Sequence, residues 1–430
     1  MRWLYSLLLY VLTPLILLRL WWRGRKAPAY RKRIAERFGF FDAPVSAGGI
    51  WVHAVSVGET IAAAPMIRAL LARYPQRTIT VTTMTPTGSE RVRVLFADAI
   101  ASGRVFHVYA PYDMPSAIGR FLRRVKPALL IVVETELWPN TIHGCATRGI
   151  PVLVANARLS EKSARGYARL GGITQPMLRD IAIVAAQNAQ DGERFVALGL
   201  PRERLQVTGS VKFDLTIDAA LQARAQQLRD VIGARPVWIA ASTHAGEDEI
   251  LLAAQRDVLK RNPDALLILV PRHPERFNTV ANLIAAAGLS MQRRSDGAAV
   301  QADTQVLLGD TMGELLMLFG AADVAFVGGS LIERGGHNTL EPAAWGLPII
   351  TGASDFNFRE ISELLQVAGA LCKRCDARAI AAEIGQLFAG AELRSRRGQA
   401  ALTVVEKNRG ALQKLLHEIA LIIPPAPAAH

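Results

Sequence analysis

The chain has 430 residues, half of them hydrophobic, and a formal net charge of +13. This length accommodates two domains with complete cores. The charge favours an anionic partner, either nucleic acid or a membrane with acidic lipids, but the chain has no basic patch interleaved with aromatic residues of the kind that reads nucleic acid. Three cysteines argue against a disulfide framework and fit a reducing compartment, and the lone pair Cys372 and Cys375 is too little for zinc.

The N-terminus is predicted to be a membrane anchor over residues 1–22. Residues 3–18 carry no charge, and Arg19 and a tryptophan pair suited to an interface follow. A basic cluster at residues 23–33 comes after the apolar run, so the segment does not read as a cleaved signal peptide, and the body of the protein is expected on the cytoplasmic side. The run is short against the ~20 residues of a full span, and Pro14 leaves open a helix that lies in one leaflet.

Strand-like and helix-like segments then alternate through the first half of the chain. Amphipathic stretches at 60–74 and 139–148 separate short apolar runs, which is typical of a parallel sheet covered on both faces. The predicted strands are 50–55, 78–84, 128–133, 151–155 and 181–185.

The alternation weakens over the polar segment 214–235 and then resumes. The sequence predicts a second parallel sheet and a long final helical stretch over 392–422. The expected fold class is therefore α/β, with two doubly wound Rossmann-like domains facing a cleft, at 23–218 and 219–430. The predicted strands of the second sheet are 237–241, 265–270, 306–308, 324–327 and 348–351.

A glycine-rich run, Gly335-Gly336-His337-Asn338-Thr339-Leu340-Glu341-Pro342, follows the predicted strand 324–327. A glycine turn from strand into helix lets the backbone approach a ligand and points free N–H groups at an anion such as a phosphate. Asn338 or Thr339 suits a helix cap, and Glu341 suits a ribose diol. The run predicts a nucleotide site.

Polar residues also follow the strands of the first sheet. Glu59 lies at the start of a helix after strand 50–55, where a general base and a carboxylate stabilised by the helix dipole are equally consistent with the pattern. The hydroxyl-rich segment 82–90 suits a sugar or phosphate site, or a helix cap.

Two carboxylates, Glu134 and Glu136, follow the buried strand 128–133 directly. Carboxylates in such a place need either a paired cation or a role in the site. Arg158 or a neighbouring lysine is the candidate cation. For Glu134 we favour a role in the site. Arg158 and Lys212 each follow an apolar or glycine-containing segment and supply the cations that an anionic donor requires.

Arg272 and His273 follow the second strand of the second sheet and suit a phosphate. The segment 310–314 follows the third strand and offers backbone contacts to a base or ribose. The chain has no Asp-x-Asp pair and no His/Cys cluster at ligand spacing, so no metal-dependent chemistry and no cofactor are expected.

Together these segments resemble the 3-deoxy-D-manno-octulosonic acid (Kdo) transferases of lipopolysaccharide synthesis. The likeness extends over essentially the whole chain. It rests on Ser-Val-Gly-Glu at 56–59, Glu-Thr-Glu-Leu-Trp-Pro-Asn at 134–140, Asn-Ala-Arg-Leu-Ser at 156–160, Pro-Arg-His-Pro at 271–274, and Gly-Gly-His-Asn with Leu-Glu at 335–341. Thr339 departs from the family's pattern, which has proline there.

The resemblance implies an inverting, metal-independent GT-B glycosyltransferase at the cytoplasmic side of the inner membrane. Its donor would be CMP-Kdo and its acceptor the anionic tetraacyldisaccharide 4'-phosphate precursor of lipid A. By the same likeness Glu59 is the general base, and Glu134 and Lys212 stabilise the transition state. The residues implied to bind CMP are Arg272, His273, Met312, Gly313, Glu314, Asn338, Thr339, Leu340 and Glu341.

Three alternatives make different demands on the sequence. A Rossmann oxidoreductase would carry Gly-x-Gly-x-x-Gly in its first βα unit, which this chain lacks. A membrane scaffold without activity would not need polar clusters at so many strand ends. Another GT-B transferase, using a UDP-sugar and a lipid-linked acceptor, is the closest competitor.

Overall fold

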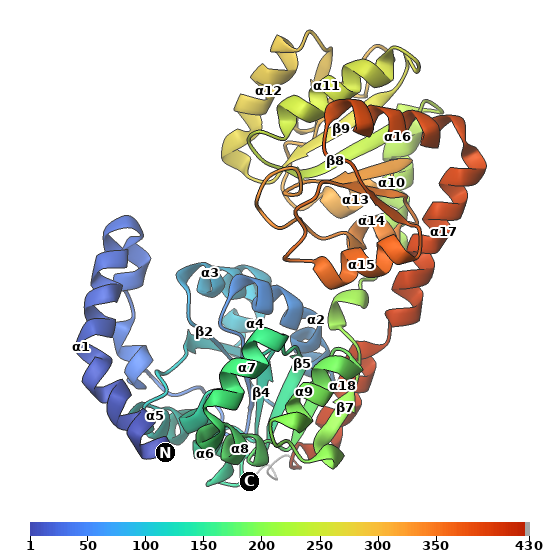
Figure 1. The fold of residues 1–430 in the computed structure, drawn as a ribbon. Coiled ribbons are helices and arrows are strands. Elements are labelled where there is room, and N and C mark those ends of the chain that lie inside the picture. Colours follow the sequence, from blue (N-terminus) through green and yellow to red (C-terminus); the bar gives the residue numbers. More distant parts are fainter. Residues whose placement is uncertain (426–430) are drawn as a thin grey trace. The chain divides into compact units, whose positions relative to one another are not determined.

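A computed structural model describes residues 1–425, apart from the side chain of Lys26. The chain divides into two compact units (Figure 1). Unit 1 combines Met1–Lys212 with the segment that begins at Arg409, and unit 2 is Phe213–Asn408. The sequence analysis had assigned residues 219–430 to a single domain, whereas here the last helix belongs with the first unit.

Unit 1 is built on a seven-stranded parallel sheet with the order β3-β2-β1-β4-β5-β6-β7. Its strands are β1 (Ile50–His53), β2 (Ile79–Thr83), β3 (Val105–Tyr109), β4 (Leu129–Val133), β5 (Val152–Ala157), β6 (Ile183–Ala186) and β7 (Leu205–Val207). Its helices are α1 (Arg2–Lys26), α2 (Val57–Arg73), α3 (Pro86–Leu95), α4 (Ala97–Ala101), α5 (Pro115–Val125), α6 (Pro139–Ala146), α7 (Glu161–Arg169), α8 (Gly171–Arg179), α9 (Ala189–Ala197) and α18 (Ala411–Ile422). Short 3-10 helices are η1 (Pro28–Arg31), η2 (Ile34–Phe38), η3 (Arg202–Arg204) and η4 (Val211–Phe213).

Both faces of this sheet are buried, as its continuous apolar strands predict. Residues of β1 alternate between two cores: Ile50 and Val52 pack with α2, α3 and α18, and Trp51 packs with α5, α6, α8 and α9. The sequence analysis missed β3, whose centre carries the polar His107, and β7, a three-residue strand with little burial.

Unit 2 repeats the design with a second seven-stranded parallel sheet, in the order β10-β11-β9-β8-β12-β13-β14. Its strands are β8 (Val237–Thr243), β9 (Leu266–Pro271), β10 (Met291–Arg293), β11 (Val306–Leu308), β12 (Val324–Val327), β13 (Ile349–Thr351) and β14 (Leu371–Lys373). Its helices are α10 (Ala219–Ile232), α11 (Asp248–Leu259), α12 (Phe277–Ala286), α13 (Leu315–Phe319), α14 (Leu340–Ala344), α15 (Arg359–Val367), α16 (Ala377–Ala389) and α17 (Ala391–Asn408), with the short turns η5 (Pro274–Arg276) and η6 (Arg294–Asp296).

The predicted class of two doubly wound α/β domains is confirmed. The short edge strands β10 and β14 were missed, because three residues of mixed polarity carry no strand signal. The single helix expected over 392–422 is wrong: it is interrupted at Gly410, whose φ of 94° ends α17 and starts α18. Beyond that turn, Leu415 and Ile419 of α18 enter the core of unit 1.

Candidate active site

Glu59 lies in the first turn of α2, directly after β1. The Ser56 hydroxyl caps the helix by accepting the Glu59 N–H (3.3 Å) and donates to Glu59 Oε1 (2.7 Å). The Val55 N–H donates to Oε2 (2.8 Å). Glu59 therefore takes part in the cap of α2, and its place in the first turn suits a carboxylate stabilised by the helix dipole, one of the two roles that the sequence left open. Each of its carboxylate oxygens keeps a second lone pair that can accept a further hydrogen bond or a proton.

The environment of Glu59 also favours the other role, that of a base. Burial raises its pKa to about 7, against the hydrogen bonds from Ser56 and Val55, and the charges of Glu136 and Glu134 raise it further. A carboxylate with a pKa near the working pH accepts a proton readily and releases it afterwards. The cap and the base are thus compatible uses of one side chain.

This raised pKa predicts a pH-dependent cost to stability. A carboxyl whose pKa is higher in the folded state than in the unfolded chain destabilises the fold progressively as pH rises from about 4.5 to 7. Glutamine cannot ionise, so the melting temperature of Glu59→Gln relative to the parent should increase between pH 5 and pH 8. At ~1.4 kcal/mol per pKa unit the gain amounts to a few degrees. Calorimetry at both pH values measures it; a pH-independent difference would show that Glu59 does not titrate in this range.

Glu134 follows β4 and adopts a left-handed backbone with φ of 61°, which is costly for a residue with a side chain. Its carboxylate lies 3.8 Å from Lys212 Nζ, and both side chains remain about a quarter exposed. The structure thus brings together two predicted site residues that are 78 positions apart. The cation beside Glu134 is a lysine, one of the two alternatives that the sequence left open.

Asn156, at the end of β5, holds the turn that carries Lys212. It also has a left-handed backbone, with φ of 53°, and its Oδ1 accepts the Val211 N–H (3.2 Å). Its buried Nδ2 has no hydrogen-bond partner within residues 1–425. Sequence analysis noted the segment 156–160 for Arg158 and missed this positioning role of Asn156.

The segment 82–90 is a helix cap. The Thr85 hydroxyl accepts the Gly88 N–H (3.1 Å) at the start of α3. This is the second of the two roles that its hydroxyl-rich sequence allowed.

In unit 2, a fully buried carboxylate organises the glycine loop that follows β12. Glu247 accepts the backbone N–H groups of His244 (3.0 Å), Gly329 (2.7 Å), Ser330 and Leu331 (both 3.0 Å). A side chain on Gly329 would lie within 2.8 Å of the His337 ring, so only glycine fits there. The sequence analysis assigned no role to Glu247, which lies between β8 and α11.

A cluster of three histidines with Arg272 lies at this end of the second sheet. His244 and His337 stack with ring centroids 5.1 Å apart, and their Nε2 atoms are 2.8 Å apart. The His273 ring meets that of His244 edge-on at 5.3 Å. Burial, together with the positive charges of Arg272 and the other two histidines, lowers the pKa of His337 to about 4. Burial, followed by the charges of His273 and nearby arginines, lowers the pKa of His244 as well, so Arg272 is the better candidate than this pair to attract an anion.

The motif at 338–341 is split between the site and the core. Asn338 Nδ2 donates to Glu341 Oε1 (3.1 Å), and burial raises the pKa of Glu341 while Asn338 and the charge of Arg272 oppose that rise. Thr339 and Leu340 are buried, and the Thr339 hydroxyl has no hydrogen-bond partner within residues 1–425. Thr339 is the N-cap and Leu340 the first residue of α14, a helix of only five residues whose dipole is a minor source of positive potential.

Glu314 has its side chain committed within the protein. Its carboxylate accepts hydrogen bonds from Arg294 (3.1 and 3.2 Å), Arg224 (3.1 Å) and Thr311 (2.6 Å). Burial works to raise its pKa, but the Thr311 and Arg294 hydrogen bonds and the charges of both arginines outweigh it, and the pKa is lowered. Met312 is largely exposed, and Gly313 has a φ of 84°. This loop therefore offers a ligand its backbone and the Met312 side chain.

Two doubly wound units with polar side chains at the carboxyl edges of their parallel sheets fit a glycosyltransferase, and the sequence comparisons identify this class. The sequence profile described as 3-deoxy-D-manno-octulosonic-acid transferase (kdotransferase) matches residues 32–215, and that of glycosyl transferases group 1 matches residues 234–404. A Kdo transferase of Haemophilus influenzae is 47% identical over 96% of this chain and 97% of its own length. The chain belongs to the Kdo transferase family.

Other relatives agree with this placement. The Kdo transferase of Bordetella pertussis is 38% identical and covers 96% of this chain and 98% of its own. Among solved structures, the UDP-GlcNAc 2-epimerase of Neisseria meningitidis has a TM-score of 0.58 at 14% identity, covering 87% of this chain and all of its own. A glycosyltransferase of Rickettsia africae has a TM-score of 0.56 at 14% identity, covering 89% and 100%. The last two show a shared fold alone.

Proposed function

We propose that the protein transfers Kdo from CMP-Kdo to the tetraacyldisaccharide 4'-phosphate precursor of lipid A. The observation that carries this proposal is the cluster of Glu59, Glu134 and Lys212 at the carboxyl edge of the first sheet, in a member of the Kdo transferase family. The cluster combines a base of suitable pKa with a cation for an anionic sugar.

The reaction is a single displacement. Glu59 takes the proton of the acceptor's sugar hydroxyl as the hydroxyl oxygen forms a bond to the anomeric carbon of Kdo. The bond between that carbon and the phosphate oxygen breaks, and CMP leaves with the electron pair. Attack from the face opposite CMP inverts the configuration. Glu59 then returns its proton to solvent, which a pKa of about 7 allows.

Lys212 and Glu134 act on the charge that develops during this step. Lys212 lies beside Glu134, and Kdo carries its own carboxylate, so the ammonium stabilises negative charge on the sugar and the departing group. Glu134 holds the ammonium in place from 3.8 Å.

The donor's nucleotide is assigned to unit 2. Arg272 pairs with the phosphate, His273 lies beside it, and Glu341 accepts from the ribose hydroxyls. The loop around Met312 and Gly313 supplies backbone groups to the base. Glu247 holds the glycine loop through four N–H groups, which keeps the backbone shaped for close approach of the ligand.

We further propose that transfer needs no metal ion. Residues 1–425 hold no group of three or more His, Cys, Asp or Glu side chains suited to bind one. Lys212 and Arg272 provide positive charge where a metal would otherwise neutralise the donor. The protein is assigned to the cytoplasmic face of the inner membrane, with α1 as its membrane element, since residues 2–25 form a helix that by length and composition could cross a membrane.

Transfer assays with a single acceptor test the assignment directly. The purified protein, given radiolabelled lipid A precursor, should form a product with CMP-Kdo, in the presence of EDTA, and none with UDP-sugars. A product only with a UDP-sugar would favour the competing GT-B transferase. A strict need for added Mg²⁺ in transfer would contradict metal independence.

Arg272→Ala and Glu341→Ala should each weaken CMP binding. A hydrogen bond to a charged group contributes about 1.5–3 kcal/mol, so Kd should rise by roughly 10- to 100-fold for Arg272→Ala. Isothermal titration with CMP measures this. Arg261→Ala is the matched control, because Arg261 is exposed and precedes β9, at the opposite edge of the sheet. Unchanged CMP affinity in both site variants would place the nucleotide elsewhere.

A further inference from the structure

The first half of helix α1 has two distinct faces, and its exposed apolar face continues to the end of the helix. Nine large apolar side chains are 49–67% exposed: Trp3, Leu4, Leu7, Leu8, Val11, Leu15, Leu18, Trp21 and Trp22. At 100° per residue these positions fall within an arc of about 140°. The opposite face carries Arg2, Tyr5, Ser6 and Thr13, which contact the body of unit 1. A helix surrounded by lipid on all sides would not need this division.

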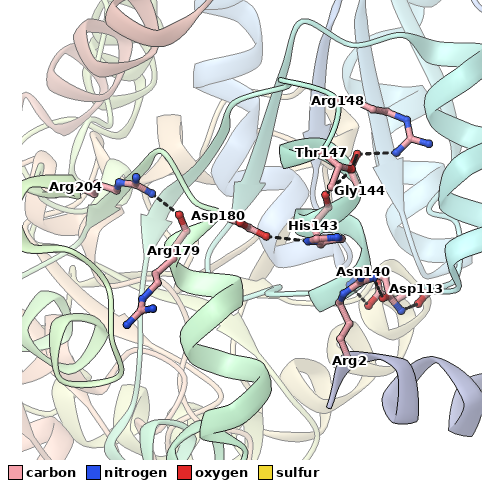
Figure 2. Close-up of polar contacts among 10 residues, drawn as sticks. All are labelled: Arg2, Asp113, Asn140, His143, Gly144, Thr147, Arg148, Arg179, Asp180 and Arg204. Atoms are coloured by element: carbon pink, nitrogen blue, oxygen red, sulfur yellow. Dashed lines mark hydrogen bonds and ion pairs between the residues drawn. The ribbon is translucent and has the colours of Figure 1, made fainter.

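The N-terminal turns of α1 are clamped to unit 1 by polar contacts (Figure 2). Arg2 donates to Asn140 Oδ1 (3.1 Å), and the Ser6 hydroxyl lies 3.0–3.2 Å from the same side-chain amide. The Tyr5 hydroxyl donates to Asp113 Oδ2 (3.0 Å). Asp113 is buried and also accepts the backbone N–H groups of Asn140 (2.9 Å) and Thr141 (2.7 Å). The clamp is thus joined to the start of α6.

These contacts continue along the helix for three turns. The Tyr10 hydroxyl donates to Ser116 Oγ (2.8 Å) and accepts the Ser116 N–H (3.1 Å) at the start of α5. The Thr13 hydroxyl lies 3.8 Å from Met114 Sδ. The first half of α1 is therefore fixed against the loops that lead into α5 and α6.

A membrane-spanning arrangement is incompatible with this clamp. At 1.5 Å per residue, α1 is about 37 Å long, so a spanning α1 would place Arg2 on the far side of the bilayer from residues 23–33. Tyr5 and Tyr10 would then lose their partners on unit 1 and enter lipid or cross it, whereas Ser6 would keep its bond to the Arg2 carbonyl inside the helix. Unpaired polar groups in lipid cost several kcal/mol each. The clamp and the span exclude one another.

We propose that α1 lies in the plane of the cytoplasmic leaflet, with its exposed apolar face in the bilayer and its polar face on unit 1. The partner is an anionic lipid surface. Arg19, Arg25 and Lys32 are exposed next to the apolar face and supply the complementary charge. Arg33 is not part of this surface, because it pairs with Glu36 (2.5 Å) and donates to Ser89 (3.0 Å).

This arrangement rests on the proposed lipid acceptor and gives it a route to the site. Asp113 and Asn140 lie on the segments that follow β3 and β4, which end at the carboxyl edge of the sheet. Glu59 and Glu134 lie at the same edge, because all strands are parallel. An α1 lying in the leaflet therefore holds the acceptor edge of unit 1 at the bilayer surface.

Protease protection of an N-terminal epitope tests the topology. In a Gram-negative host, the epitope on the full chain should survive protease added to spheroplasts and be digested in inside-out vesicles. A C-terminal epitope serves as the cytoplasmic control. Digestion of the N-terminal epitope in spheroplasts would overturn the proposal, as would recovery of the full-length protein in the soluble fraction. Neither result depends on the transfer reaction, which the CMP-Kdo assay tests separately.

Cross-linking tests the clamp itself. In a Cys372→Ser, Cys375→Ser background, where Cys145 is buried, the pair Tyr10→Cys and Ser116→Cys should be joined by a short bis-maleimide in native membranes. The pair Leu15→Cys and Ser116→Cys is the control, since Leu15 lies on the apolar face. Cross-linking of the first pair in detergent but not in membranes would show that α1 leaves unit 1 in the bilayer and would overturn the proposal.

Discussion

Glu59→Gln should lower kcat for Kdo transfer by about 10²- to 10⁴-fold, the usual contribution of a general base. Glutamine preserves the shape of the side chain and one acceptor for the cap of α2, so the loss reports proton transfer. CMP affinity should not change, because the proposed nucleotide contacts belong to unit 2. Rates at saturating donor and acceptor, with CMP titrations alongside, measure both quantities.

Glu161→Gln is the matched control for this variant. Glu161 also lies in the first turn of a helix that a serine caps, but it is exposed and pairs with Arg165. Its substitution should leave kcat unchanged. In the parent enzyme, kcat/KM should rise with pH through about 7, since Glu59 must be ionised to accept a proton. Activity near the parent level in Glu59→Gln would refute its assignment as the base.

Lys212→Ala should lower kcat by roughly 10²- to 10³-fold, which is typical when one group that stabilises transition-state charge is removed. KM should change much less than kcat, because the ammonium is assigned to charge that develops during the displacement. Steady-state kinetics with CMP-Kdo separate the two parameters.

Lys162→Ala controls for loss of a positive charge, since Lys162 is exposed on α7. Asn156→Ala should reproduce part of the Lys212→Ala defect, because it frees the turn at Val211 that carries the lysine. If Lys212→Ala raised KM alone, Lys212 would act in ground-state binding of Kdo and would have no special role in the transition state.

Much of the fold could be predicted from the sequence because buried parallel strands need no polar face. Runs such as 129–133 and 266–270 are continuous and apolar, so their length and bounds are visible in the chain itself. Strand ends could be found for the same reason, and the polar residues that follow them are the candidates Glu59, Glu134 and Arg272. Their catalytic and binding roles came from the family resemblance and stay predictions. The edge strands β7, β10 and β14 were missed because three residues carry too little pattern.

The sequence by itself determined the fold class, the apolar N-terminus and the family, since each can be recognised from patterns of contiguous residues. Tertiary structure decided which distant side chains meet. Glu134 and Lys212 form an ion pair across 78 positions, and Glu247 gathers backbone groups more than 80 residues away. It also separated Thr339 and Leu340, which enter the core, from Asn338 and Glu341 in the same motif. The two faces of α1 are visible only against Asp113 and Asn140, because an apolar run looks the same in sequence whether lipid surrounds it or covers one side.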